Sequence, residues 1–143
     1  MKDRENCVFK GDYINNQFAV PADVAGEWVQ KSPADAGDEL ARISYSYLSI
    51  PAATEAAKLA FPEWSRSNLA ERLKLIGKFR DELKRRDSEF SMLMGREIGK
   101  PHCDARDELA AAVRAVDAFL SSVEKTLQGG AVRPLGALAV VGP

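Results

Sequence analysis

The sequence is poor in the residues that most nucleophile and metal sites use. Its 143 residues include two cysteines, Cys7 and Cys103, and a single histidine, His102. Two cysteines do not make a disulfide framework. No apolar run approaches the roughly 20 residues of a membrane-spanning helix, and the charged start MKDREN has no apolar signal core. We therefore expect a protein of the reducing cytoplasm that has no membrane partner.

An excess of positive charge is also missing. The formal net charge is -1, whereas nucleic-acid binding normally needs a basic stripe, so we expect no nucleic-acid partner. The contents of 45% hydrophobic and 29% charged residues are ordinary for a globular protein and do not indicate disorder. A chain of this length is long enough to bury one real hydrophobic core.

The first third of the chain combines β-favouring residues with turn formers. Residues 8–20 (VFKGDYINNQFAV) predict a short hairpin, and Asn15-Asn16 are turn formers within it. The stretch ARISYSYL, which begins at Ala41, predicts another strand. Loops are expected between these two segments, because the chain there is interrupted by Pro21, Gly26, Pro33 and Gly37.

Helical patterns begin at Pro51. The alanine-rich stretch PAATEAAKLAFPEW predicts a helix that ends near Phe61, because Pro62 cannot be accommodated in a helix interior. Asn68 and Glu71 have the spacing of a capping box, and the apolar residues after them recur at helical intervals. This pattern predicts a helix from about 68 to 86.

Two more helices are expected after this one, with a break between them. Asp87 or Ser88 is expected to cap the first, and Gly99 to end it in a left-handed conformation. Pro101 suits the first turn of the second helix, which should stop at Gly129-Gly130. The second helix has one apolar stripe, formed by Ala105, Leu109, Val113, Val116, Leu120 and Val123.

The residues around the break, GREIGKPHCDARDE, contain groups that could form a reactive site. Cys103 near a helix N-terminus could be a nucleophile activated by His102. Neighbouring helical residues, however, point about 100° apart, and the carboxylates of Asp104 and Asp107 disfavour a thiolate. Three consecutive residues cannot converge on one metal ion either. The stretch is interpreted as a helix break, and we expect neither a catalytic residue nor a metal site in this chain.

The last apolar run, Leu135–Val141, predicts a strand buried on both faces, as in parallel sheets. The neighbours that such a strand needs are not supplied by the sequence. The expected fold is therefore an α+β fragment of an α/β fold. It has an N-terminal β-hairpin region, three to four helices and one terminal strand.

Taken in order, several segments resemble the N-terminal portion of the aldehyde dehydrogenase superfamily. They are GDYINNQF, ATEAAKLAFPEWSR, LAERLKLIGKFRDELKRR, REIGKP, the helix containing DELAAA, and RPLGALAVVGP. Their order and spacing extend over nearly the whole chain. The join from Gln128 to Arg133 is shorter than in the family, where it carries another strand of the oligomerisation region. The resemblance divides the chain into a β-rich hairpin and loop region (1–50), a helical region (51–130), and the first strand of an incomplete dinucleotide-binding domain (131–143).

Members of this family oxidise aldehydes to carboxylic acids with NAD or NADP. In them a cysteine forms a thiohemiacetal and a glutamate activates the deacylating water, and neither Cys7 nor Cys103 matches that cysteine. The resemblance therefore implies a fragment of an NAD(P)-dependent aldehyde dehydrogenase acting on an aldehyde or semialdehyde. The fragment itself is expected to be inactive and not to bind either cofactor tightly. The Gly-Pro ending favours amino-acid semialdehyde enzymes, such as the succinylglutamate semialdehyde dehydrogenases.

Only a few residues match functional positions of the family. Val141, Gly142 and Pro143 fall on a motif that borders the cofactor in relatives, although a strand end and a turn would explain them equally well. The helix that begins at Asp104 corresponds to one that flanks the substrate tunnel in relatives. The resemblance therefore implies that Glu108 or Arg114 contacts substrate.

A second hypothesis needs no enzyme. The same elements could form a non-enzymatic helical interaction or oligomerisation module. Under either hypothesis we expect self-association, because the hairpin at residues 8–20 and the strand at residues 135–141 leave backbone groups unpaired. A small-molecule aldehyde is the expected partner of the whole enzyme.

Overall fold

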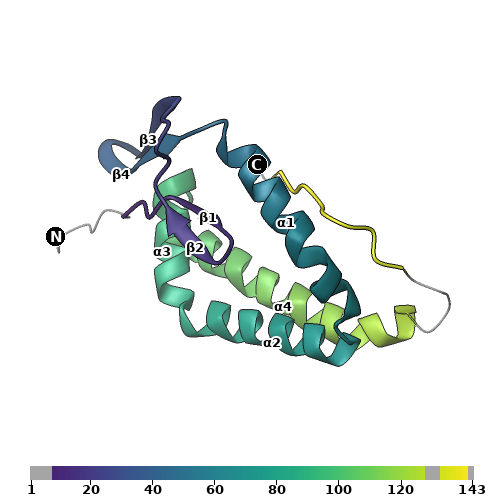
Figure 1. The fold of residues 1–143 in the computed structure, drawn as a ribbon. Coiled ribbons are helices and arrows are strands. Elements are labelled where there is room, and N and C mark those ends of the chain that lie inside the picture. The colour runs from purple at the N-terminus through teal and green to yellow at the C-terminus, as the bar shows by residue number, and fades with distance from the viewer. Residues whose placement is uncertain (1–7, 128–132, 142–143) are drawn as a thin grey trace. The chain divides into compact units, whose positions relative to one another are not determined.

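The computed structural model describes residues 8–127 and 133–141, which form four helices and two small antiparallel sheets (Figure 1). The chain divides into two compact units. The first extends to Arg66 and includes the segment from Leu135 onward, and the second spans Ser67–Pro134. This composition confirms the expected α+β class.

The predicted first hairpin is confirmed. Strands β1 (Asp12–Ile14) and β2 (Gln17–Ala19) pair antiparallel. Asn15 and Asn16 between them have φ values of 51° and 63°. Two successive left-handed residues are typical of a type I′ turn, whose twist matches that of the flanking strands, and asparagine tolerates this conformation better than most residues.

The prediction of loops after Pro21 was wrong, because that region contains a long hairpin. Strand β3 (Gly26–Ser32) pairs antiparallel with β4 (Asp35–Tyr45). Pro33 lies between the two strands, where its missing N–H costs no ladder hydrogen bond. Gly26 begins β3 opposite Tyr45, and a Cβ at Gly26 would lie 2.5 Å from the Tyr45 hydroxyl oxygen. Gly26 and Pro33 therefore mark the two ends of β3.

The register of this second hairpin is irregular only in β4. Gln30 pairs with Ala41 and Lys31 pairs with Glu39, so Leu40 is an extra residue with no partner on β3. This is a β-bulge, which re-aims side chains and increases the local twist. Leu40 is 2% exposed, so the bulge coincides with the most buried large side chain of β4.

Helix α1 (Ser49–Arg66) continues through Pro62, so the predicted end near Phe61 was wrong. Proline leaves one carbonyl of the preceding turn without its donor. No residue of α1 is buried, so water can reach that carbonyl and the helix continues. At the other end of α1, the Ser49 hydroxyl donates to Asp12 Oδ2 at 2.5 Å, which ties the helix start to β1.

The second unit consists of helices α2 (Leu69–Arg85), α3 (Asp87–Ile98) and α4 (His102–Leu127). The capping box before α2 is confirmed in both directions. Asn68 Oδ1 accepts from the Glu71 backbone N–H at 2.9 Å, and Glu71 Oε2 accepts from the Asn68 N–H at 3.2 Å. These two bonds satisfy amide donors that a helix start leaves without intrahelical partners.

The predicted cap of α3 by Asp87 or Ser88 was wrong. Arg86 is both the C-cap of α2 and the N-cap of α3, and its side chain makes no capping hydrogen bond. Its N–H donates to the Glu82 carbonyl and its carbonyl accepts from the Phe90 N–H, each at 3.0 Å. Because the hydrogen bonding passes almost without interruption from α2 to α3, the junction has no open helix start for a side chain to cap.

The predicted break between α3 and α4 is confirmed. Gly99 caps α3 with φ 71° and ψ 22°, a left-handed conformation that glycine adopts without steric cost. Pro101 immediately precedes α4, and its carbonyl accepts from the Ala105 N–H at 3.1 Å. Pro101 is therefore at the capping position, one residue earlier than the predicted first turn.

Helix α4 has the predicted apolar stripe, of which Ala105, Leu109, Val113 and Val123 are buried while Val116 and Leu120 are half-buried. It packs against both α2 and α3. Ser91 of α3 and Ala105 of α4 are both fully buried, and residues of this small size permit close approach of two helices. This stripe is the core of the second unit.

The expected terminal strand is not formed. Residues 133–141 have no strand assignment, and Leu135, Leu138, Val140 and Val141 are 83–96% exposed. A buried strand needs hydrogen-bonded neighbours, and the described strands pair only within their own hairpins.

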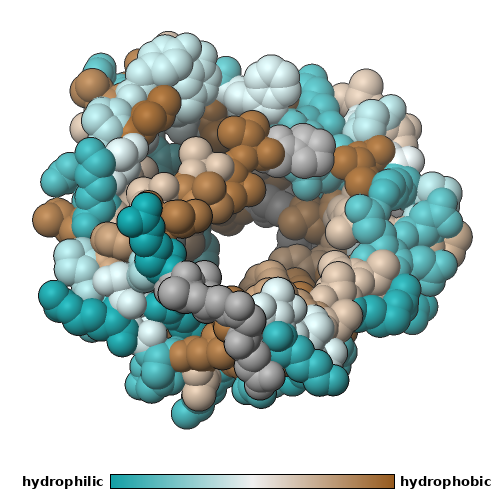
Figure 2. Space-filling view, turned by 90° about the vertical axis from the view of Figure 1, so that its right-hand side faces the viewer, coloured by the Kyte–Doolittle hydropathy of each residue, from teal (hydrophilic) through white to brown (hydrophobic). Residues whose placement is uncertain are grey.

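Other large apolar side chains are also exposed, and hydrophobic residues lie at the surface among hydrophilic ones (Figure 2). Gly129-Gly130, where α4 was expected to stop, lie outside the described residues.

Candidate functional site

The break between α3 and α4 positions the first predicted substrate residue, Glu108. Lys100, which follows Gly99 in the connection, forms an ion pair with the Glu108 carboxylate. Both side chains are partly exposed, at 38% for Lys100 and 49% for Glu108. The pair links the connecting loop to the second turn of α4. The Glu108 carboxylate therefore already has a cationic partner within the protein.

Arg114, the other predicted substrate residue, is exposed on the same helix. It follows Glu108 by six residues, which corresponds to about 9 Å along the helix axis and about 120° around it. The structure therefore does not bring Glu108 and Arg114 together on one face of α4. A small substrate that contacts one of them would need a different group to hold its other end.

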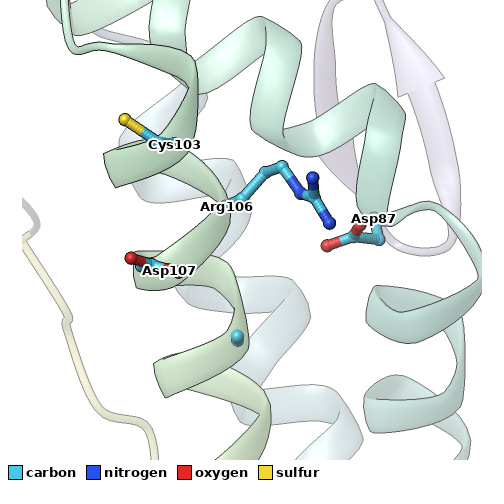
Figure 3. A pocket seen from close by; sticks show the side chains of 5 residues that line it. Asp87, Cys103, Arg106 and Asp107 are labelled. Atoms are coloured by element: carbon cyan, nitrogen blue, oxygen red, sulfur yellow. The ribbon is translucent and has the colours of Figure 1, made fainter.

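A shallow cavity of about 300 Å³ lies beside the first turns of α4. It is lined by Asp87, Cys103, Arg106, Asp107 and Ala110. Figure 3 shows the Arg106 guanidinium directed from α4 toward the Asp87 carboxylate at the start of α3. This cavity was not predicted from the sequence. Its α4 residues have the spacing i, i+3, i+4 and i+7, which places them on one face of a helix and could have indicated a shared surface.

Cys103 in this cavity is not arranged as a nucleophile. Its Sγ–H donates to the carboxylate of Asp104, with 3.5 Å between Sγ and Oδ1. This hydrogen bond directs the thiol to a carboxylate on its own helix. The described residues also contain no group of three or more His, Cys, Asp or Glu side chains that could hold a metal ion.

A group of three charged side chains in the second unit lies between α2 and α4. Asp117 accepts from Arg80 Nη1 at 2.8 Å and lies 3.5 Å from Lys84 Nζ. The hydrogen bond from Arg80 lowers the pKa of Asp117, and the charge of Lys84 acts in the same direction. The same hydrogen bond raises the pKa of Arg80. This group joins two helices and has the form of a structural ion pair.

Most of this chain matches one known protein family. The model of the Aldehyde dehydrogenase family matches residues 24–141, which is most of the chain. The chain belongs to the aldehyde dehydrogenase family. The predicted resemblance is thereby confirmed, and the match includes α1 to α4 together with the β3–β4 hairpin.

Relatives with a curated function are consistent with this assignment. The chain is 32% identical to the N-succinylglutamate 5-semialdehyde dehydrogenase of Chromobacterium violaceum over 130 residues, a match that covers 82% of this chain and 27% of the relative. It thus spans about a quarter of the length of the aldehyde dehydrogenase that it matches. The preference for succinylglutamate semialdehyde enzymes among possible relatives agrees with this similarity.

Two solved structures show the same fold. A NAD-dependent benzaldehyde dehydrogenase from Corynebacterium glutamicum superposes with a TM-score of 0.72 at 22% identity, over 80% of this chain and 25% of the other. PnpE, solved in complex with nicotinamide adenine dinucleotide, superposes with a TM-score of 0.69 at 29% identity, over 79% of this chain and 23% of the other. Over these matched parts, the chain therefore has the fold of aldehyde dehydrogenases.

Of the three predicted cofactor residues, only Val141 is described. Its side chain is 94% exposed, and it lies in a segment with no strand assignment. Gly142 and Pro143 lie outside the described residues. The described part of the chain therefore does not form a cradle for a dinucleotide around Val141.

None of the described helices is both long and apolar enough to cross a membrane.

Proposed function

We propose that this chain is the N-terminal part of an NAD(P)-dependent aldehyde dehydrogenase that oxidises an amino-acid-derived semialdehyde to a carboxylic acid. The observation that supports this most strongly is the 32% identity to N-succinylglutamate 5-semialdehyde dehydrogenase over 82% of the chain. The chain by itself contributes the helical layer and two hairpins. The nucleophile and the general base of the reaction are supplied by residues outside it.

The cofactor of the whole enzyme is proposed to be NAD or NADP. The NAD complex of PnpE, at 29% identity, supports a nicotinamide dinucleotide. Val141, Gly142 and Pro143 are proposed to border it in the whole enzyme. Because Val141 is exposed and has no strand neighbour in this structure, the isolated chain is expected not to bind the cofactor tightly.

Helix α4 is proposed to carry the substrate-facing residues. Arg114 is the stronger candidate for contact with a substrate carboxylate, because its guanidinium is exposed and a guanidinium binds a carboxylate in a bidentate manner. Glu108 is engaged by Lys100, so a role for Glu108 would be to hold the start of α4 in position.

A chimera tests this function. Residues 24–141 replace the matched region of the Chromobacterium violaceum enzyme, and NADH formation is followed with N-succinylglutamate 5-semialdehyde as the substrate. We expect a folded chimera that reduces NAD. A chimera with the circular dichroism spectrum and the oligomeric mass of the relative, but with no NADH formation, would contradict the proposal.

Variants of the chimera separate the roles on α4. Arg114→Gln is expected to raise KM for the semialdehyde roughly tenfold or more, the cost of one charge-assisted hydrogen bond, and to leave KM for NAD unchanged. Lys125→Gln, an equal charge loss at an exposed site on the same helix, is the matched control. If Glu108 acts only through Lys100, then Glu108→Gln and Lys100→Gln will have the same effect on stability and none on KM.

A further inference from the structure

Strand β3 has one open edge. It pairs with β4 on one side, and no other described strand pairs with it on the other. A sheet of only two strands is marginally stable in water, and an unpaired edge offers a row of N–H and C=O groups to another strand. A further strand could therefore pair with β3 at this edge.

The other strand of the hairpin is less suited to such pairing. Strand β4 has an extra residue at Leu40 and three more between Asp35 and Glu39, because Lys31 pairs with Glu39 while Ser32 pairs with Asp35. Bulges of this kind twist an edge away from incoming strands. Strand β3 contributes one residue at every step of the register, so its edge is the regular one.

The sequence of β3 is complementary to itself when a copy runs antiparallel with Val29 at the centre. In that register, Glu27 of each copy lies opposite Lys31 of the other, and Trp28 lies opposite Gln30. Glu27, Val29 and Lys31 share one face of the strand, because alternate residues point the same way. Trp28 is 60% exposed and would gain cover from the second copy.

The charges of the hairpin favour the same arrangement. Arg42 Nη1 lies 2.9 Å from Glu27 Oε1, and Arg42 Nε lies 2.6 Å from Glu39 Oε1. Two carboxylates thus share one guanidinium. Lys31 has no ion-pair partner within the described residues. In this register, the ammonium group of Lys31 in a second copy would lie beside Glu27 and form an ion pair with it.

We propose that β3 pairs antiparallel with β3 of a second copy of this chain, about a two-fold axis at Val29. The product is a four-stranded sheet in the order β4–β3–β3–β4. The interface is isologous, since each copy presents the same edge. This inference concerns the chain's own assembly and is independent of the proposed oxidoreductase function.

Charge reversal tests both the surface and the register. Sedimentation velocity of the 143-residue chain at low salt is expected to show a monomer–dimer equilibrium. Lys31→Glu places two like-charged pairs at the interface, and so does Glu27→Lys; each variant alone is expected to weaken the dimer roughly tenfold. An equimolar mixture of the two variants restores opposite charges at both pairs, so heterodimers should form with near wild-type affinity.

Matched controls exclude an effect of net charge alone. Lys58→Glu and Glu55→Lys make the same charge changes at exposed sites on α1, and they are expected to leave the dimer unchanged. A far-ultraviolet circular dichroism spectrum confirms that each variant is folded. Val29→Cys, in a background in which Cys7 and Cys103 are serine, is expected to form a disulfide-linked dimer under mild oxidation.

Three outcomes would overturn the proposal. The first is a constant monomer mass up to high micromolar concentration. The second is an association that Lys31→Glu and Glu27→Lys leave unchanged, since another surface would then be responsible. The third is a mixture of the two variants that stays as monomeric as each variant alone, together with no cross-link at position 29. That result would exclude the Val29-centred register even if the chain dimerises.

Discussion

Arg80 of α2 donates a hydrogen bond from Nη1 to Oδ1 of Asp117 in α4 at 2.8 Å, and Lys84 lies 3.5 Å from the second oxygen of the same carboxylate. Arg80 and Lys84 are one turn apart on α2, so a single side chain on α4 holds two cations of one helix face. Arg80 also pairs with Asp81 on its own helix. The pairing with Asp117 is therefore a polar contact that joins these two helices.

The contribution of this contact to stability should depend on pH. The pKa of Asp117 is lowered in the folded protein, so the pair stabilises the fold fully above the ordinary Asp pKa of about 3.9 and loses its contribution as pH falls through the lowered value. Asp117→Asn is therefore expected to lower Tm slightly at pH 7. The deficit should shrink below about pH 4, because wild-type Asp117 then becomes protonated as well.

Asp81→Asn is the matched control for this measurement. It removes a carboxylate that Arg80 contacts within α2 without joining two helices. Thermal melts of both variants from pH 7 to pH 2 decide the point. An equal deficit in the two variants at every pH would show that the contact between α2 and α4 contributes nothing specific.

Gly99→Val is expected to destabilise the protein by about 1 kcal/mol or more, because a β-branched residue tolerates a φ of 71° poorly. Gly77→Ala is the opposite control. A Cβ at Gly77 would meet no atom within 4 Å, so in the interior of α2 alanine should stabilise by roughly 0.5–1 kcal/mol. Urea unfolding measures both. Equal shifts in the same direction would contradict the assigned left-handed cap.

Asn68→Ala should cost about 1 kcal/mol, since it removes the side-chain acceptor of the Glu71 N–H at the start of α2. Asn68→Ser retains an acceptor and should cost only a few tenths of a kcal/mol. The comparison is made by urea unfolding at neutral pH. Identical midpoints for the alanine and serine variants would mean that the capping box does not contribute to stability.

The isolated chain is expected to show no oxidation of N-succinylglutamate 5-semialdehyde with NAD or NADP. The thiol of Cys103 donates to Asp104, and no described residue activates it. Mass-verified protein is assayed by absorbance at the wavelength of the reduced cofactor, with Cys103→Ser as the comparison. Turnover that disappears in Cys103→Ser would refute both the inactivity and the interpretation of Cys103.

The tight turn at Asn15-Asn16, the capping box at Asn68 and the left-handed cap at Gly99 were predictable from the sequence. Each depends on the conformational preferences of a few adjacent residues, and these preferences hold whatever lies elsewhere in the fold. The apolar stripe of α4 was predictable for a related reason, because a period of 3.6 residues defines one face before any partner is known.

The tertiary structure decided the features that depend on a partner or on solvent. Strand β3 was predicted as a loop because its ladder is completed by residues 3 to 19 positions away on β4, and no local signal reports that pairing. Pro62 is tolerated because α1 has no buried residue, a property of the fold and not of the proline. The pairing of Lys100 with Glu108 spans a helix break, so its geometry follows from the turn at Gly99.

The same distinction applies to the end of the chain. The composition of residues 135–141 gives a high preference for a buried strand, yet the segment is exposed in this structure. Formation of a strand depends on distant parts of the fold, because its backbone groups hydrogen-bond to neighbouring strands and its side chains are buried by the elements that cover the sheet. The sequence by itself determined the turn at Asn15-Asn16 and the helix caps at Asn68 and Gly99, and the available neighbours decided which extended segments became sheet.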